Sequence, residues 1–94
     1  MEQIYKGKKI VIMGLGLHGG GVAAARFFCS QESDVLVTDL KTEDQLADSI
    51  KKLAGLPIKY TLGGHKEEDF LTADLIVKNP DVPWSSPYIE ISKK

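Results

Sequence analysis

The chain has 94 residues, the usual size of one domain, and 43% of them are hydrophobic and 27% charged. This composition is typical of a globular domain and excludes a disordered or fibrous chain. Twelve basic and 13 acidic residues give a formal net charge of -1, which does not favour nucleic acid or an anionic membrane as partner. No apolar run approaches the roughly 18 residues that span a bilayer, and the first residues lack the apolar core of a signal peptide. We therefore expect a cytoplasmic domain that neither binds nucleic acid nor enters a membrane.

Short apolar runs alternate with helical patterns along the chain. The runs that predict strands are residues 9–13, 35–38, 58–61 and 75–77. After Lys9 the first run is continuously apolar rather than alternating, as in a strand covered on both faces. The segments that predict helices are residues 22–29, 42–53 and 67–71. Strands that alternate with helices imply right-handed crossovers, so we expect an α/β, Rossmann-like three-layer domain over residues 1–94, with a mostly parallel sheet in the order 3-2-1-4.

Local signals refine these elements. In the segment 42–53, Leu46, Ile50 and Leu53 share one stripe, and Thr42 with Gln45 forms a possible capping box at its start. The single cysteine excludes an internal disulfide, and its apolar surroundings indicate a place in the core.

The last residues read as a loop followed by the start of a helix. Ser86 and Pro87 are a good N-cap and first helical residue, while Trp84 is expected to pack under the loop, with stacking on a base as the alternative. Only a few residues follow Pro87, too few for a stable helix without packing partners. We therefore expect residues 1–94 to be the N-terminal fragment of a longer protein.

A glycine motif follows the first predicted strand. Its residues are Gly14, Leu15, Gly16, Leu17, His18 and Gly19. Glycines with this spacing, between a strand and an alanine-rich helix, allow backbone N–H groups and a helix N-terminus to approach an anion. The motif alone is weak, but its context predicts a phosphate site rather than a structural turn. For the two glycines that follow, Gly20 and Gly21, close packing of the helix on the sheet is preferred over direct approach to a ligand.

Asp39 ends the second predicted strand, 20 residues after Gly19. Its carboxylate suits a ribose hydroxyl, as in NAD enzymes, or a donor on a nucleobase, and the alternative is a solvated acid that caps the next turn. His18 would lie at a helix N-terminus and could donate to a phosphate, without a visible catalytic partner. His65 is interpreted as a loop residue.

Several reaction centres are missing from the sequence. It contains no phosphate-binding P-loop of the form G-x-x-x-x-G-K-[ST], no Cys/His spacing for a metal and no G-x-S-x-G nucleophile motif. We therefore expect a binding domain with no catalytic residue and no metal site of its own.

Other segments of the chain form a recognisable pattern together with the glycine motif. Together, residues 12–19, 37–39, 73–80 and 82–83 resemble the N-terminal domain of a Mur ligase, most closely the MurD-like, D-glutamate-adding branch of that family. The resemblance spans essentially the whole chain. The strand 75–77 followed by Lys78-Asn79-Pro80 is far more specific than the glycines, which dehydrogenases share.

The resemblance implies a ligand for this domain and separate roles for the other domains of the family. In this family the N-terminal domain binds the uridine nucleotide of UDP-N-acetylmuramoyl-L-alanine and no cofactor. Missing domains would bind ATP with magnesium and the incoming D-glutamate, for an ATP-dependent amide bond formed through an acyl phosphate. The implied substrate-binding residues are those of the glycine motif around Leu17 and His18 for the diphosphate, Asp39 and Leu40 for the uracil, and Asn79, Pro80 and Asp81 for the opposite wall.

Two residues depart from the family pattern, and two other functions compete. The family commonly has a small hydroxyl residue at the position of His18 and a glycine or small residue at that of Asp81, where a carboxylate would repel a diphosphate. The alternatives are an NAD(P)-binding domain of a dehydrogenase and an NAD-sensing regulatory module. Neither requires the loop at Asn79 and Pro80.

Overall fold

A four-stranded parallel sheet forms the centre of the computed structural model, which describes residues 4–15 and 20–79. In chain order its elements are β1 (Lys9–Met13), α1 (Gly20–Ser30), β2 (Asp34–Asp39), α2 (Ala47–Lys52), β3 (Ile58–Leu62), α3 (Glu67–Leu71) and β4 (Leu75–Lys78). The strand order is β3-β2-β1-β4, so the predicted α/β fold and its strand order are confirmed.

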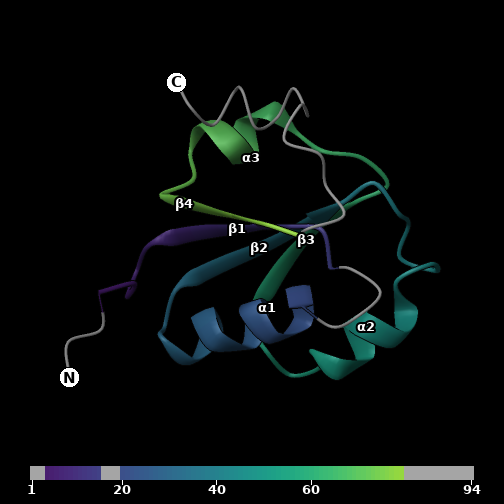
Figure 1. Cartoon of the computed structure of the whole chain (residues 1–94), viewed down its shortest axis with the longest axis horizontal. Helices are drawn as coiled ribbons and strands as arrows, with labels where there is room; N and C mark the ends of the chain where they lie inside the picture. Colours follow the sequence, from purple (N-terminus) through teal and green to yellow (C-terminus); the bar gives the residue numbers. More distant parts are fainter. Residues whose placement is uncertain (1–3, 16–19, 80–94) are drawn as a thin grey trace.

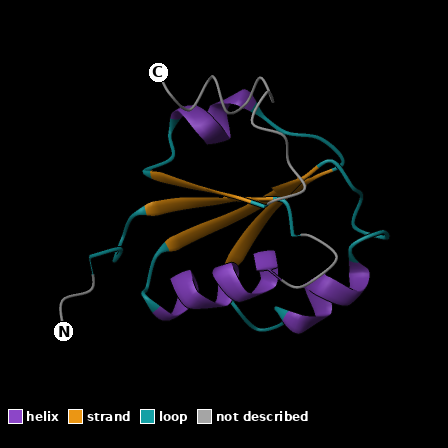
Figure 2. Ribbon diagram, in the orientation of Figure 1, coloured by secondary structure: helices purple, strands orange, loops and turns teal. Residues whose placement is uncertain are grey.

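Helices cover both faces of the sheet (Figures 1 and 2). Helices α1 and α2 lie on one face and α3 lies on the other, which gives the three layers expected. The central strand β1 supplies both cores: Ile10 and Ile12 pack towards α1 and α2, while Val11 and Met13 pack with Phe70 of α3. Because both faces are covered, β1 is apolar at every buried position, and its residues 10–13 are at most 1% exposed.

Helix α1 starts at Gly20, slightly before its predicted start, and buries the face predicted for it. Val22, Ala25 and Phe28 are buried on that face. At its end, Glu32 has a left-handed φ of 60°, and Ser33 N donates to Phe28 O at 3.1 Å, which closes the helix. The cysteine at 29 is half-buried against this core rather than fully inside it.

Helix α2 corrects the prediction for residues 42–53. The helix begins at Ala47, and residues 43–46 form turns. Gln45 Oε1 does accept a hydrogen bond from Thr42 N at 2.9 Å, as in a capping box, but that bond closes a turn here. The apolar stripe is confirmed, since Leu46 and Leu53 are buried and Ile50 packs against them. The predicted helix start at Ser86 and Pro87 and the side chain of Trp84 lie outside the described residues.

Candidate functional site

The ends of three parallel strands meet beside the start of α1. Strand β1 continues into Gly14, whose N–H donates to Thr38 O of β2 at 2.8 Å. On the other side of β1, Asn79 N donates to Met13 O at 2.9 Å. The chain leaves β1 over one face through α1 and enters β4 from the other face through α3 (Figure 1). A change of crossover direction between neighbouring strands opens a crevice at their carboxyl ends, where ligands of such sheets bind.

The start of the glycine motif is packed tightly under α1. Gly14 has a φ of 90°, in the left-handed region, and Leu15 is fully buried. Gly21 N donates to Leu15 O at 3.1 Å. A Cβ on Gly21 would lie 2.5 Å from both Gly14 O and Leu15 Cα. Close packing of helix on sheet is therefore confirmed for Gly21.

Gly20 differs from its neighbour because it faces the crevice. A Cβ built there would meet only Asn79 Nδ2, at 3.9 Å. A small cavity of about 40 Å³ lies between Gly20 and Asn79. It is lined by Ile12, Gly14, Gly20, Gly21, Val77, Lys78 and Asn79. This volume is enough for a single water. The remaining predicted residues of the motif, Gly16, Leu17, His18 and Gly19, lie outside the described residues.

Asp39 joins the glycine motif to the turn after β2. Its side chain is only 9% exposed, its Oδ2 accepts from Leu15 N at 3.0 Å, and its Oδ1 accepts from Lys41 N at 2.9 Å. The alternative of a solvated acid is therefore wrong, although Asp39 does cap the next turn. A carboxylate offers about four lone-pair directions, so both oxygens retain capacity for a ligand donor. The carboxylate both organises the crevice and can bind in it.

The two walls of the crevice differ in chemistry. Leu40, next to Asp39, is 70% exposed and offers an apolar surface of the kind on which a planar base can rest. Asn79 stands across β1 with its amide towards Gly20. Pro80 and Asp81, the other predicted residues of that wall, lie outside the described residues. Strand ends thus bring Leu15, Asp39, Leu40 and Asn79 to one edge of the sheet.

His65 is a contact residue that the sequence interpretation missed. Its Nδ1 lies 2.7 Å from Thr38 Oγ1, and its ring packs edge-on against Phe70 with the centroids 5.7 Å apart. Burial lowers the pKa of His65, and the nearby Asp39 carboxylate opposes that shift only in part. The imidazole is therefore neutral near pH 7. His65 lies in a loop, as interpreted from the sequence, but its side chain forms part of the fold beside Asp39.

The lowered pKa of His65 predicts a pH-dependent stability. Above about pH 6.5, the ordinary histidine pKa, the imidazole is neutral in both the folded and the unfolded chain. As the pH falls below that value, the unfolded chain binds the proton more readily, so the free energy of unfolding should decrease until the lower folded pKa is passed. Urea unfolding between about pH 7.5 and 5.5 measures this slope.

The matched variant for this slope is His65→Asn, which should unfold with a weaker pH dependence over the same interval. Repeating the comparison in a His18→Asn background removes the other of the two histidines. An equal slope with and without His65 would show that the folded chain does not perturb this imidazole.

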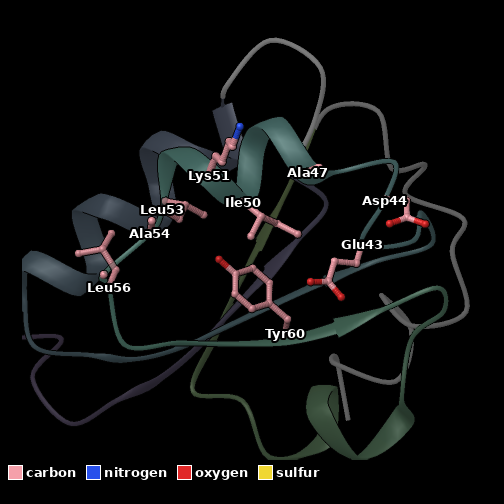
Figure 3. Close-up of a pocket in the computed structure, with 10 residues that line it drawn as sticks. Glu43, Asp44, Ala47, Ile50, Lys51, Leu53, Ala54, Leu56 and Tyr60 are labelled. Carbon is pink, nitrogen blue, oxygen red and sulfur yellow. The ribbon is translucent and has the colours of Figure 1, made fainter.

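A larger cavity lies elsewhere, between α2 and β3 (Figure 3). It measures about 470 Å³ and opens widely to solvent; its lining includes Ile50, Leu53, Leu56 and Tyr60, with Glu43 and Asp44 at one end. Burial, followed by the charge of the half-buried cysteine, raises the pKa of Tyr60. None of the predicted site residues lines this cavity, so the crevice and the cavity are separate features.

Two further searches covered residues 4–15 and 20–79. No three His, Cys, Asp or Glu side chains in these ranges are grouped so that they could hold a metal ion. Nor does any helix in this part of the chain have the length and apolar character needed to cross a membrane.

The fold and the crevice define a class: a doubly wound α/β domain with a glycine turn and an acidic residue at neighbouring strand ends. Residues 8–94 match the family model described as Mur ligase MurD-like, N-terminal domain. The chain belongs to this family. The recognition of a MurD-like N-terminal domain from the sequence is thereby confirmed.

The chain is similar to several longer proteins named UDP-N-acetylmuramoylalanine--D-glutamate ligase. The relative from Roseiflexus sp. (strain RS-1) is 49% identical over 87 residues, which cover 93% of this chain and 19% of the relative. Those from Treponema pallidum and Borreliella burgdorferi (strain ZS7) are 48% and 44% identical, over 87% and 95% of this chain and 16% and 20% of their own lengths. The chain therefore spans about a fifth of the length of the relatives it matches.

Proposed function

We propose that this chain binds the uridine diphosphate part of UDP-N-acetylmuramoyl-L-alanine, as the N-terminal domain of a ligase that adds D-glutamate. The observation that carries the proposal is the Asp39 carboxylate, held by Leu15 N at 3.0 Å at the mouth of the crevice. The names of the relatives, which couple UDP-N-acetylmuramoylalanine with D-glutamate, support this choice of ligand.

Each part of the crevice has a role in this proposal. Backbone N–H groups of the glycine motif around Leu17 and His18, together with the start of α1, receive the diphosphate, since a helix N-terminus favours anions. Asp39 accepts a hydrogen bond from the uracil, whose ring rests on the exposed side chain of Leu40. Asn79, Pro80 and Asp81 provide the opposite wall.

The chemical step belongs to the rest of the complete enzyme in this proposal. The described residues of this chain bind and orient the substrate, and we assign no catalytic residue among them. In the complete enzyme, ATP and magnesium would activate the substrate carboxylate at another domain, and D-glutamate would enter at a third. The compartment proposed is the cytoplasm.

A competing function is an NAD(P)-binding domain, either of a dehydrogenase or of an NAD-sensing module. The position of Asp39 at the end of β2 suits a ribose hydroxyl equally well, and that is the observation in its favour. The two functions differ in the ligand preferred, which a direct titration decides.

We expect the chain to bind UDP and UDP-N-acetylmuramoyl-L-alanine more tightly than NAD or NADP. Isothermal titration calorimetry measures the four affinities, and NMR titration locates the contact through the amide signals of Leu15, Leu40, Lys41 and Asn79. UMP serves as the control for the second phosphate and should bind more weakly than UDP. Tighter binding of NAD or NADP, or UDP-induced shifts confined to the cavity between α2 and β3, would contradict the proposal.

A further inference from the structure

The segment 63–65 crosses the end of β2 and is hydrogen-bonded there at successive residues. Gly64 N donates to Asp39 O at 3.1 Å, and His65 Nδ1 lies 2.7 Å from Thr38 Oγ1. The Gly64 to Asp39 bridge is antiparallel, whereas β2 and β3 pair in parallel, because the chain turns back after β3. The segment therefore closes over the strand end that carries Asp39.

Two buried partners fix the imidazole of His65. Thr38 is fully buried, and Phe70 is only 2% exposed. The planes of the His65 and Phe70 rings are 89° apart, the edge-to-face arrangement favoured by aromatic pairs. Phe70 itself belongs to the core that contains Val11, Met13 and Leu36. The imidazole is thus anchored in the core on the α3 face, and through Thr38 it holds the end of β2.

The end of β2 in turn holds the glycine turn. The carbonyl of Thr38 accepts from Gly14 N at 2.8 Å, and the carboxylate of Asp39 accepts from Leu15 N at 3.0 Å. A shift of Thr38 and Asp39 would therefore displace both backbone groups. The network runs from Phe70 and His65, through the end of β2, to the crevice.

We propose that His65 is a positioning residue for the nucleotide crevice: its hydrogen bond with Thr38 holds segment 63–65 across β2 and thereby sets the geometry of Asp39 and the glycine turn. This inference rests on the proposed function, since it concerns the same crevice. His65 contacts Thr38 and acts through it, and it is not assigned a contact with the ligand.

Binding measurements on two single variants test the role. Thr38→Val keeps the shape of the side chain and removes the hydroxyl, and His65→Asn removes the ring. Each should weaken UDP binding about tenfold, because each breaks the same part-buried hydrogen bond. In the double variant the effects should not add, which is the signature of a shared interaction. Calorimetry well below the unfolding temperature gives the dissociation constants.

The matched control is Ser33→Ala, at the opposite end of the same strand. Ser33 is 9% exposed, and its Oγ donates to Tyr5 O at 2.8 Å, so this variant also loses a part-buried hydrogen bond. It should lower the unfolding temperature and leave UDP affinity unchanged. If Thr38→Val and His65→Asn likewise lower only the unfolding temperature, their role is structural and the inference is wrong.

Amide hydrogen exchange provides a readout that needs no ligand. In both Thr38→Val and His65→Asn, the amides of Leu15 and Gly64 should exchange about tenfold faster relative to core amides of β1, because their acceptors on Asp39 are no longer held in place. Unchanged relative protection would overturn the positioning role, even where UDP still binds. Faster exchange in a chain that fails to bind UDP would support the positioning role of His65 and reject the proposed ligand.

Discussion

Replacing Gly21 by alanine is expected to lower the free energy of unfolding by about 3 kcal/mol, at the upper end of the usual cost of overpacking. The added methyl group would lie 2.5 Å from Gly14 O and Leu15 Cα, and neither backbone atom can rotate away. To relieve the clash, α1 must move off the sheet or the glycine turn must shift. The first movement opens the core around Ala25 and Val22, and the second displaces Leu15 N from Asp39.

Gly20→Ala is the matched control for this prediction. It adds the same methyl group one residue earlier, where the nearest atom, Asn79 Nδ2, is 3.9 Å away. Its stability should stay within about 1 kcal/mol of the original chain, since alanine also favours the helix. Urea unfolding of both variants measures the difference. Equal stabilities would show that α1 can slide on the sheet without cost, which would contradict the packing described for Gly21.

The strands and their order could be predicted because each depends on a local and repetitive signal. Residues 10–13 are apolar without alternation, and this pattern indicates that β1 belongs to a sheet covered on both faces. Helix α3 was predicted with its observed bounds, from the acidic residues at its start. Such local patterns predict the folded structure correctly because the tertiary contacts favour the same elements.

The start of α2 could not be predicted because one signal serves two structures. The hydrogen bond from Thr42 N to Gln45 Oε1 occurs in a capping box and equally in the turn formed here. The burial of Leu46 decides between them, since its side chain packs into the core from the turn rather than from within the helix. Propensity alone carries no information on that packing.

The parts of the candidate site that follow from strand order were predicted. The part that depends on the chain turning back over the end of β2 was missed. Asp39 and the glycine motif lie at neighbouring strand ends, which the order 3-2-1-4 already brings together. His65, in contrast, meets Thr38 from 27 residues away because the chain turns back after β3. The only local sign of that turn is the pair Gly63 and Gly64, which does not specify what the next side chain contacts.

Replacing Asp39 by alanine should both destabilise the fold and abolish most UDP binding. The change leaves Leu15 N and Lys41 N without their acceptor, and hydrogen bonds to a charged acceptor are the more costly to lose. We expect the free energy of unfolding to fall by about 3 kcal/mol and UDP affinity by more than about tenfold. The stability and the UDP affinity of Asp39→Asn should fall between those of the original chain and those of Asp39→Ala. Its amide oxygen can accept a hydrogen bond from one of the two N–H groups, while its NH₂ group opposes the other.

Asp34→Ala provides the comparison at the other end of β2. Asp34 pairs with Lys59 at 3.7 Å, with side chains that are 49% and 72% exposed, so the loss should be less than about 1 kcal/mol. UDP affinity should not change in this variant. Urea unfolding and calorimetry on Asp39→Ala, Asp39→Asn and Asp34→Ala separate the two roles of Asp39. Normal UDP affinity in a folded Asp39→Ala chain would remove Asp39 from the binding site, whereas stability equal to that of Asp34→Ala would show that its backbone hydrogen bonds do not organise the crevice.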